Sequence, residues 1–169
     1  LSADVSASRL DNGDRYRIDG GIAQDVAQGS IAIQEGEDGI LGDLAGLPGL
    51  GPVNVQARAG GNSAANTMSF TLRAGPLKAD GQGTLQLASE RADIAFNVTA
   101  PQMKLRDDLS WQSLSATGRF HGSFTQPQIE AYLIVGDGRF DTLKAEQIAL
   151  NVIGDAGRAD LDAVVTGLV

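Results

Sequence analysis

Close carboxylates are the first residues of this sequence whose types and spacing could do chemistry. Asp107 and Asp108 are adjacent, and Glu35, Glu37 and Asp38 form a second acidic group. Such groups could hold a hard cation such as Ca²⁺ or work as a general acid and base. Both groups stand beside Gly or Ser in segments that we expect to be loops, so we interpret them as solvated loop charge.

The sequence lacks the histidines and cysteines that most metal sites and many nucleophilic mechanisms need. His121 is the one histidine of the chain and there is no cysteine, which excludes two-histidine and thiolate metal sites, disulfides and cysteine nucleophiles. His121 follows Arg119 on the polar side of an expected strand, and no recognisable motif places a Ser or Asp beside it. We therefore predict that the protein is not an enzyme and has no catalytic residue, metal site or cofactor.

The charge and the hydropathy of the chain argue against a nucleic-acid partner and against a transmembrane span. The 13 basic and 21 acidic residues give a net charge of −8, which argues against nucleic acid because its binders concentrate positive charge. No apolar stretch reaches the roughly 18 residues that a membrane helix needs, so we expect no transmembrane span. With 22 glycines and only 5% aromatic residues, the inward side chains must be mostly aliphatic or small.

Alternation of apolar and polar residues dominates the chain and indicates half-buried strands. From Val53, for example, Val53 and Val55 take one face while Asn54 and Gln56 take the other. We expect an all-β protein of about ten antiparallel strands, at 1–7, 16–22, 53–59, 67–74, 76–87, 91–100, 114–124, 128–135, 148–152 and 161–165. We also expect at most one short helix, near 40–47, where Ile40, Leu44 and Leu47 repeat at helical spacing.

Turn residues punctuate these strands. The expected turns are Asn12-Gly13, Ala74-Gly75-Pro76, Ser89-Glu90, Gln126-Pro127, Gly136-Asp137-Gly138 and Asp155-Ala156-Gly157. The stretch 101–111 interrupts the alternation, and we expect it to cross an edge or an end of the sheet. The strands form one series, so we predict a single domain over 1–169.

The apolar faces of so many strands need cover, and two arrangements provide it. The sheet could close as a sandwich or barrel, or it could curl into a trough with an apolar inner wall. Alternation alone favours the sandwich, because monomers rarely expose large apolar patches. Gly81, Gly83, Gly118 and Gly122 fall on the apolar faces, where they remove bulk.

Four segments resemble the repeat region of the TamB family of translocation and assembly module proteins, which is related to the AsmA-like and repeating β-groove lipid-transfer proteins. The segments are LAGLPGLGPVNVQARAGG (44–61), LRAGPLKADGQGTLQLASERADIAFNVTAPQM (72–103), LSWQSLSATGRFHGSFTQPQ (109–128) and GDAGRADLDAVVTGL (154–168). They cover most of the chain from about Leu44 onward. Their phrases are patterns of strand and turn residues and not catalytic signatures.

This resemblance implies a long curled sheet, a β-taco or β-groove with an aliphatic interior, whose open wall contacts phospholipid acyl chains and whose glycines leave room for them. The expected lining residues are Val53, Val55, Met68, Phe70, Leu72, Leu77, Leu85, Leu87, Ile94, Phe96, Val98, Leu114, Phe120, Phe124, Ile129, Leu133, Val135, Ile148, Leu150, Val152, Leu161 and Val165.

The resemblance also implies a setting. The chain would be an internal fragment of a longer, repetitive, inner-membrane-anchored protein of the Gram-negative periplasm. It would carry phospholipids between the inner and outer membranes and support outer-membrane protein assembly and translocation. The outer-membrane protein TamA and β-barrel clients would be contacted by other parts of the full-length protein, because this sequence lacks the family's N-terminal anchor and TamA-contacting end.

Two other functions stay open. A scaffold or chaperone could pair exposed sheet edges with unfolded outer-membrane strands by β-augmentation. A closed β-sandwich could serve as an adhesin or carbohydrate-binding module, although the scarcity of aromatic residues for sugar stacking argues against it.

Overall fold

The computed structural model describes the chain apart from residues 1, 9–12, 24–25, 38, 42–50 and 63–65. The described residues form eleven strands, one turn of 3₁₀ helix and two helical residues, Ile40 and Leu41. The bounds are β1 Ser2–Ser8, β2 Arg15–Ala23, β3 Val26–Glu35, β4 Val53–Asn62, β5 Asn66–Ala74, β6 Leu77–Gln86, η1 Leu87–Ser89, β7 Arg91–Arg106, β8 Leu109–Ser123, β9 Pro127–Phe140, β10 Leu143–Asp155 and β11 Ala159–Thr166.

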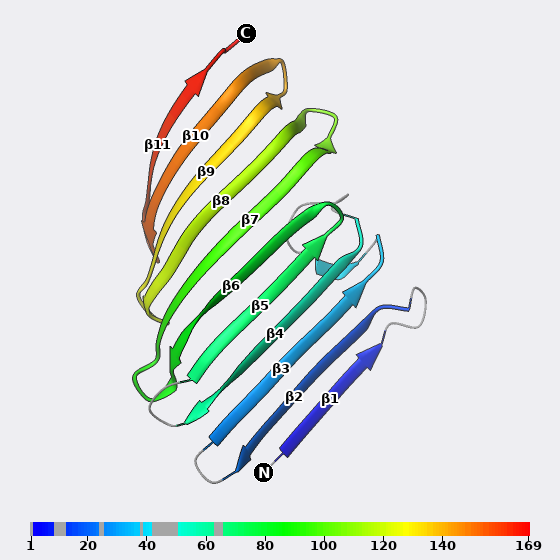
Figure 1. Cartoon of the computed structure of the whole chain (residues 1–169), viewed down its shortest axis with the longest axis vertical. Helices are drawn as coiled ribbons and strands as arrows, with labels where there is room; N and C mark the ends of the chain where they lie inside the picture. The colour runs from blue at the N-terminus through cyan, green and yellow to red at the C-terminus, as the bar shows by residue number, and fades with distance from the viewer. Residues whose placement is uncertain (1, 9–12, 24–25, 38, 42–50, 63–65) are drawn as a thin grey trace.

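All eleven strands belong to one open, curled sheet. Their order in space is their order in the sequence, β1 to β11, and every neighbouring pair is antiparallel. The strands lie side by side from β1, near the N-terminus, to β11, near the C-terminus (Figure 1). β1 and β11 each pair with one strand, so the sheet is not closed. The expected all-β groove is therefore confirmed, and the two packed layers of a sandwich are not what the strands form.

Turn residues shape several of the hairpins. Gly75, at φ 55, and Pro76 join β5 to β6, and Glu90, at φ 52, joins η1 to β7. The Asp155 side chain accepts hydrogen bonds from the backbone N–H groups of Gly157 and Arg158, at 2.8 and 2.9 Å, which closes the turn before β11. Of the expected Asn12-Gly13 turn, Asn12 lies outside the described residues, while Gly13 has φ 78.

Three expectations about local structure are wrong. Residues 26–35, which we did not expect to be a strand, form β3. The stretch 101–111 does not leave the sheet, because β7 runs to Arg106 and β8 begins at Leu109. The segment 136–138 is not a hairpin turn but lies within β9, and that hairpin turns at Asp141 and Thr142.

Glu35 is not the solvated loop charge that we expected. It ends β3 and is only 5% exposed. Its carboxylate accepts a hydrogen bond from the Tyr16 hydroxyl, at 2.6 Å, and another from the backbone N–H of Leu41, at 2.9 Å. These bonds satisfy a buried charge that would otherwise be costly. Ile40 and Leu41 are helical, while most of the expected helix near 40–47 lies outside the described residues.

Candidate functional site: an apolar groove

The pairing register brings apolar residues of successive strands into rows that cross the sheet. Direct cross-strand partners point to the same face, so each row belongs to one face. One row runs through Val55, Leu72, Ala79, Val98, Ala116, Leu133 and Leu150. The adjacent row runs through Ala57, Phe70, Gly81, Phe96, Gly118, Ala131 and Val152. We call the side that carries these rows the apolar face.

From β4 to β10 the apolar face is the more sheltered side of the sheet. Alanines allow a comparison at constant side-chain size: Ala79 and Ala116 on the apolar face are half-buried, whereas Ala95 on the opposite face is exposed. In β5 the same alternation separates half-buried Phe70 and Leu72 from exposed Ser69 and Thr71. The apolar face is thus the inner wall of the curled sheet, and its side chains are partly covered without being sealed.

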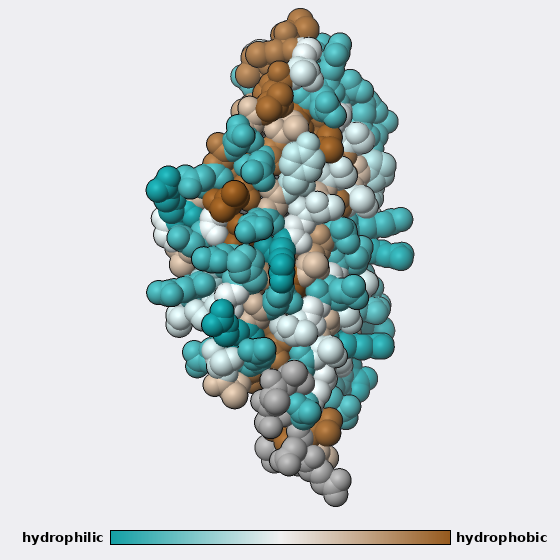
Figure 2. Space-filling model, turned by 60° about the vertical axis from the view of Figure 1, so that its left-hand side comes forward, coloured by the Kyte–Doolittle hydropathy of each residue, from teal (hydrophilic) through white to brown (hydrophobic). Residues whose placement is uncertain are grey.

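Hydrophilic side chains cover most of the view in Figure 2. Apolar residues gather at the top of that view, the end of the molecule where the C-terminus lies. There every described side chain of β11 is exposed, and Leu161, Val164 and Leu168 are 62 to 66% exposed.

Two phenylalanine rings lie over glycines on the apolar face. A Cβ atom on Gly81 would overlap the ring of Phe70, and one on Gly118 would overlap the ring of Phe96. Both glycines are the direct cross-strand partners of these rings. We had expected the glycines to leave room for acyl chains. Gly81 and Gly118 do not, because the neighbouring rings of Phe70 and Phe96 occupy the space that they open.

The register places most of the expected lining residues on the apolar face. The strand residues among them, from Val53 on β4 to Val165 on β11, are aligned along its rows. Leu87 and Phe124 are exceptions: Leu87 lies in η1 and Phe124 in the bend between β8 and β9, and both are about half exposed.

Sequence reasoning missed the part of the apolar face on the first three strands. Val5, Ile18 and Ile31 are cross-strand partners in the row that continues to Ala57. The signal was available, because Ile31 and Ile33 alternate with the neighbouring Ala32 and Gln34.

In the four longest strands, β7 to β10, the regular alternation of side chains between the two faces is interrupted near one end of the groove. Pairing is regular up to Pro101 with Ser113 and resumes at Met103 with Trp111. In β9 and β10 it is regular up to Gly136 with Gln147 and resumes at Gly138 with Ala145. The skipped residues, which form one polar and exposed row, are Gln102, Gln112, Asp137 and Glu146.

This interruption keeps apolar side chains on the inner side. Met103 follows Ala100 by three residues, an odd step that would normally place them on opposite faces, yet both belong to one buried cluster. A Cβ atom on Gly138 would contact Val135 at 3.3 Å and Ile148 at 3.5 Å, so Gly138 also faces the inner side. Asp137, at φ 48, has the unusual backbone that absorbs the change.

Trp111 lies at the centre of the most buried part of the groove. It is 8% exposed and forms a buried cluster with Ala100 and Met103. Leu77, Leu109, Leu114 and Val135 pack against this cluster, and Leu77, Leu114 and Val135 belong to the expected lining. The indole Nε1 of Trp111 is buried and has no hydrogen-bond partner among the residues that the structure describes. We did not predict this residue as part of the lining, because the alternation is broken on either side of it.

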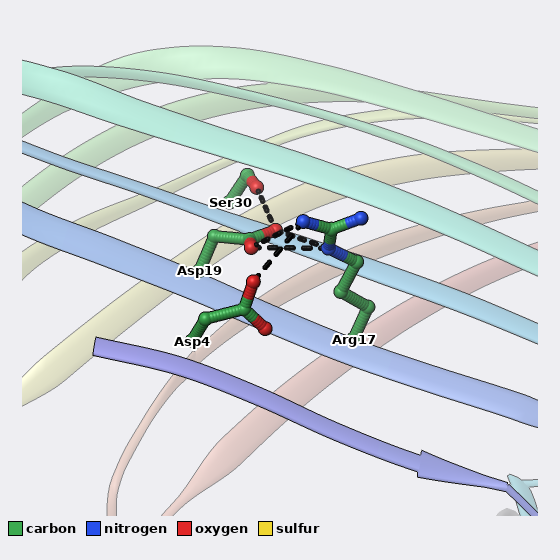
Figure 3. A network of polar contacts seen from close by, with 4 residues as sticks. All are labelled: Asp4, Arg17, Asp19 and Ser30. Atoms are coloured by element: carbon green, nitrogen blue, oxygen red, sulfur yellow. Dashed lines mark hydrogen bonds and ion pairs between the residues drawn. The ribbon is translucent and has the colours of Figure 1, made fainter. Parts of the chain in front are cut away.

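The opposite face carries ion pairs, beside an open cavity that Asp4, Asp19, Ser30 and Arg58 line. Arg17 on β2 contacts Asp4 and Asp19, and Ser30 donates to Asp19 at 3.2 Å (Figure 3). The hydrogen bond from Arg17 lowers the pKa of Asp19, and the same bond raises the pKa of Arg17. All of these groups are solvent-accessible, so the pairs add little to stability.

The residues considered for catalysis also lie among such pairs. Asp107 contacts Lys104 at 2.7 Å, and this hydrogen bond lowers the pKa of Asp107. His121 lies 3.6 Å from Glu130 and is the direct cross-strand partner of Asp93. Asp93 in turn pairs with Arg119, whose hydrogen bond lowers the pKa of Asp93.

The described residues contain no group of three or more His, Cys, Asp and Glu side chains that could hold a metal ion. Among the same residues, no helix is both long and apolar enough to cross a membrane. No protein-family model matches the chain, and neither a curated protein nor a solved structure matches it. Because the comparisons give no relative, the proposed function rests on the geometry of the groove.

Proposed function

We propose that this chain is a segment of a hydrophobic conduit that carries phospholipid acyl chains. The single observation that supports this proposal most directly is the apolar face, whose rows continue across the sheet and over which the described strands form no second layer. A catalytic site would need converging polar groups, whereas an acyl chain needs only a continuous apolar wall.

The magnitudes fit this role. A lipid with about 30 methylenes would lose about 24 kcal/mol of favourable burial in water, at about 0.8 kcal/mol for each methylene. A wall that replaces the bilayer interior removes much of that barrier without recognising a particular lipid. The polar headgroup would stay in solvent at the open side of the groove.

The resemblance to the TamB family supports a cellular setting for the proposal. On this basis the chain belongs to the periplasmic part of an inner-membrane-anchored protein of a Gram-negative envelope. It would carry phospholipids between the two membranes and support the assembly of outer-membrane proteins. TamA and β-barrel clients would bind other parts of the full-length protein.

Site-specific photo-crosslinking in the full-length protein tests the conduit. A photoreactive residue at Phe70, Leu85 or Phe96 should form lipid adducts, because these side chains lie on the apolar face. Thr84, which neighbours Leu85 but is exposed on the other face, is the matched control. Adducts at Thr84 alone would contradict the proposal.

A charge placed in the groove should also interrupt binding. We expect Leu72→Arg to abolish binding of a fluorescent fatty acid, because the guanidinium would have to be desolvated beside the acyl chain. Thr71→Arg adds the same charge one residue away on the exposed face and should leave binding unchanged. Circular dichroism would confirm that both variants keep their strands. Equal loss of binding in the two variants would contradict a one-sided groove.

A scaffold that pairs with unfolded strands is the second candidate. The observation in its favour is β11, which has a free edge and exposes Leu161 and Val164 on opposite faces. A photoreactive residue at Val164 should then crosslink to newly made outer-membrane barrel proteins, whereas one at Thr71, in the middle of the sheet, should not. Equal adducts at both positions would reject edge pairing.

A further inference from the structure

Trp111 places a buried hydrogen-bond donor in the wall of the groove. Its side chain is 8% exposed, and no acceptor in the described part of the chain lies within hydrogen-bond reach of its Nε1 atom. The side chains that surround it are hydrocarbons and one thioether: Ala100, Met103, Leu77, Leu109, Leu114 and Val135. A buried donor is normally paired, so an unpaired indole in a candidate binding groove calls for an explanation.

The position of Trp111 suggests what could pair with it. On one side lie Leu114 and Val135, which belong to the wall proposed to contact acyl chains. In the other direction along β8 lies the end of the β7–β8 hairpin, where Lys104 and Asp107 form an exposed ion pair. Trp111 therefore stands at a border between apolar and polar surface.

Phospholipids have a border of the same kind, where the ester carbonyls join the methylene chains to the glycerol and headgroup. Tryptophan prefers such borders because it presents an apolar ring and one polar N–H. We propose that the Nε1–H of Trp111 donates a hydrogen bond to an ester carbonyl of a phospholipid whose chains lie along Leu114 and Val135. Trp111 would thus be a positioning residue that sets where the lipid's ester region sits. This inference rests on the proposed conduit function.

Access to the indole requires a side-chain movement, and the neighbour best suited to it is Met103. Met103 is the direct cross-strand partner of Trp111. Its unbranched thioether side chain can change rotamer at low cost. An entering carbonyl would satisfy the unpaired donor, which offsets part of the cost of the movement.

Two matched probes test the assignment in the unaltered chain. Dihexanoyl-phosphatidylcholine carries two ester carbonyls, and its dihexyl ether analogue lacks both. Each would be titrated into the full chain below its micelle concentration, with affinity measured by calorimetry. We expect the ester to bind about fivefold more tightly than the ether, as one additional hydrogen bond allows. Trp111 is the only tryptophan, so its emission should shift with the ester.

Two variants show whether Trp111 causes this preference. Trp111→Phe keeps an aromatic ring without the N–H and should reduce the preference to about one. Phe96→Leu, elsewhere on the apolar face, should weaken both probes and keep the preference. If Trp111→Phe does not fold, the comparison of the two probes in the unaltered chain still decides the inference.

The outcomes separate this inference from the proposed function. If both probes bind with equal affinity, the conduit stands and the role of Trp111 is rejected. If the unaltered chain prefers the ester but Trp111→Phe keeps that preference, the assignment to Trp111 is rejected. If neither probe binds, both the conduit and the inference are rejected.

Discussion

Phenylalanine and glycine pairs shape the floor of the groove. The ring of Phe70 lies over Gly81 and the ring of Phe96 over Gly118, so each ring occupies the space that a side chain at the glycine would take. This arrangement gives the two aromatic rings a place in a wall of mostly aliphatic side chains. It also leaves no room for a methyl group on either glycine.

Gly118→Ala should therefore destabilise the fold. Its new methyl group would overlap the Phe96 ring and the backbone oxygen of Glu130. We expect the free energy of unfolding to fall by about 1–3 kcal/mol, the usual cost of overpacking. Gly60→Ala is the control, because its methyl group would meet its nearest neighbours at 3.7 and 3.8 Å. Urea unfolding measures both variants, and equal stability would contradict the ring-over-glycine packing.

The Asp93–Arg119 pair predicts a loss of stability in acid. The hydrogen bond from Arg119 lowers the pKa of Asp93 in the folded state. The pair therefore stabilises the fold above the ordinary aspartate pKa of about 4, and that contribution is lost as the pH falls through the lowered value. Asp93→Asn should show a smaller drop in Tm between pH 7 and pH 3 than the unaltered chain. Arg119→Gln should have the same effect, and an unchanged drop in both would contradict the prediction.

At the scale of elements, Asp137 enables the change of face in β9. Its φ of 48 lies in the left-handed region, where a β-branched residue is strained. We expect Asp137→Val to lower the free energy of unfolding by about 1–2 kcal/mol, while Asp137→Gly keeps or raises it.

The emission of Trp111 during urea unfolding reports both stability and the packing of the cluster beyond the interruption. Gln128→Val, at an exposed and regularly paired position of β9, is the control and should be tolerated. Equal effects of valine at both positions would show that the backbone of Asp137 is not strained by a β-branched residue.

Alternation predicted strands where one face is apolar and the other polar, as in β5 and β6. It failed at Pro101 to Trp111 and at Gly136 to Gly138, and both failures have one cause. The strands pass through a row of skipped pairs, so the period of two is broken although the pairing continues. A local rule cannot distinguish a break of that kind from a turn, because the neighbouring strands that hold the chain in the sheet are distant in sequence.

The same limit applies to the candidate site. Apart from Leu87 and Phe124, the register places the expected lining residues on one face from Val53 onward, because alternation determines the face of a strand residue directly. Alternation does not determine whether that face is sealed by a second layer or left open. The open groove was expected from the resemblance, and the sandwich that the pattern favoured did not form. Glu35 was misjudged because its burial depends on Tyr16 and Leu41, which only the fold brings to it.

At the scale of the whole molecule, strands adjacent in sequence provide the extensive contacts. Stability should then vary along the sheet, as it does in repeat proteins. We expect amide hydrogen exchange to be slowest in β7 and β8, which are the longest strands and carry the Trp111 cluster. It should be fastest in β11, where every side chain is exposed. Mass spectrometry of exchanged peptides measures this gradient, and uniform protection from β1 to β11 would contradict it.

The sequential strand order also bears on how such a protein could change its length. Insertion of one complete hairpin between existing hairpins adds two strands, or about 10 Å across the sheet. Each inserted pair leaves the direction of every other strand and the face of every other side chain as before. Reach could therefore grow by duplication of short gene segments while the cross-section stays constant. A single inserted strand would reverse the direction of all that follow, so lengthening should proceed in steps of two.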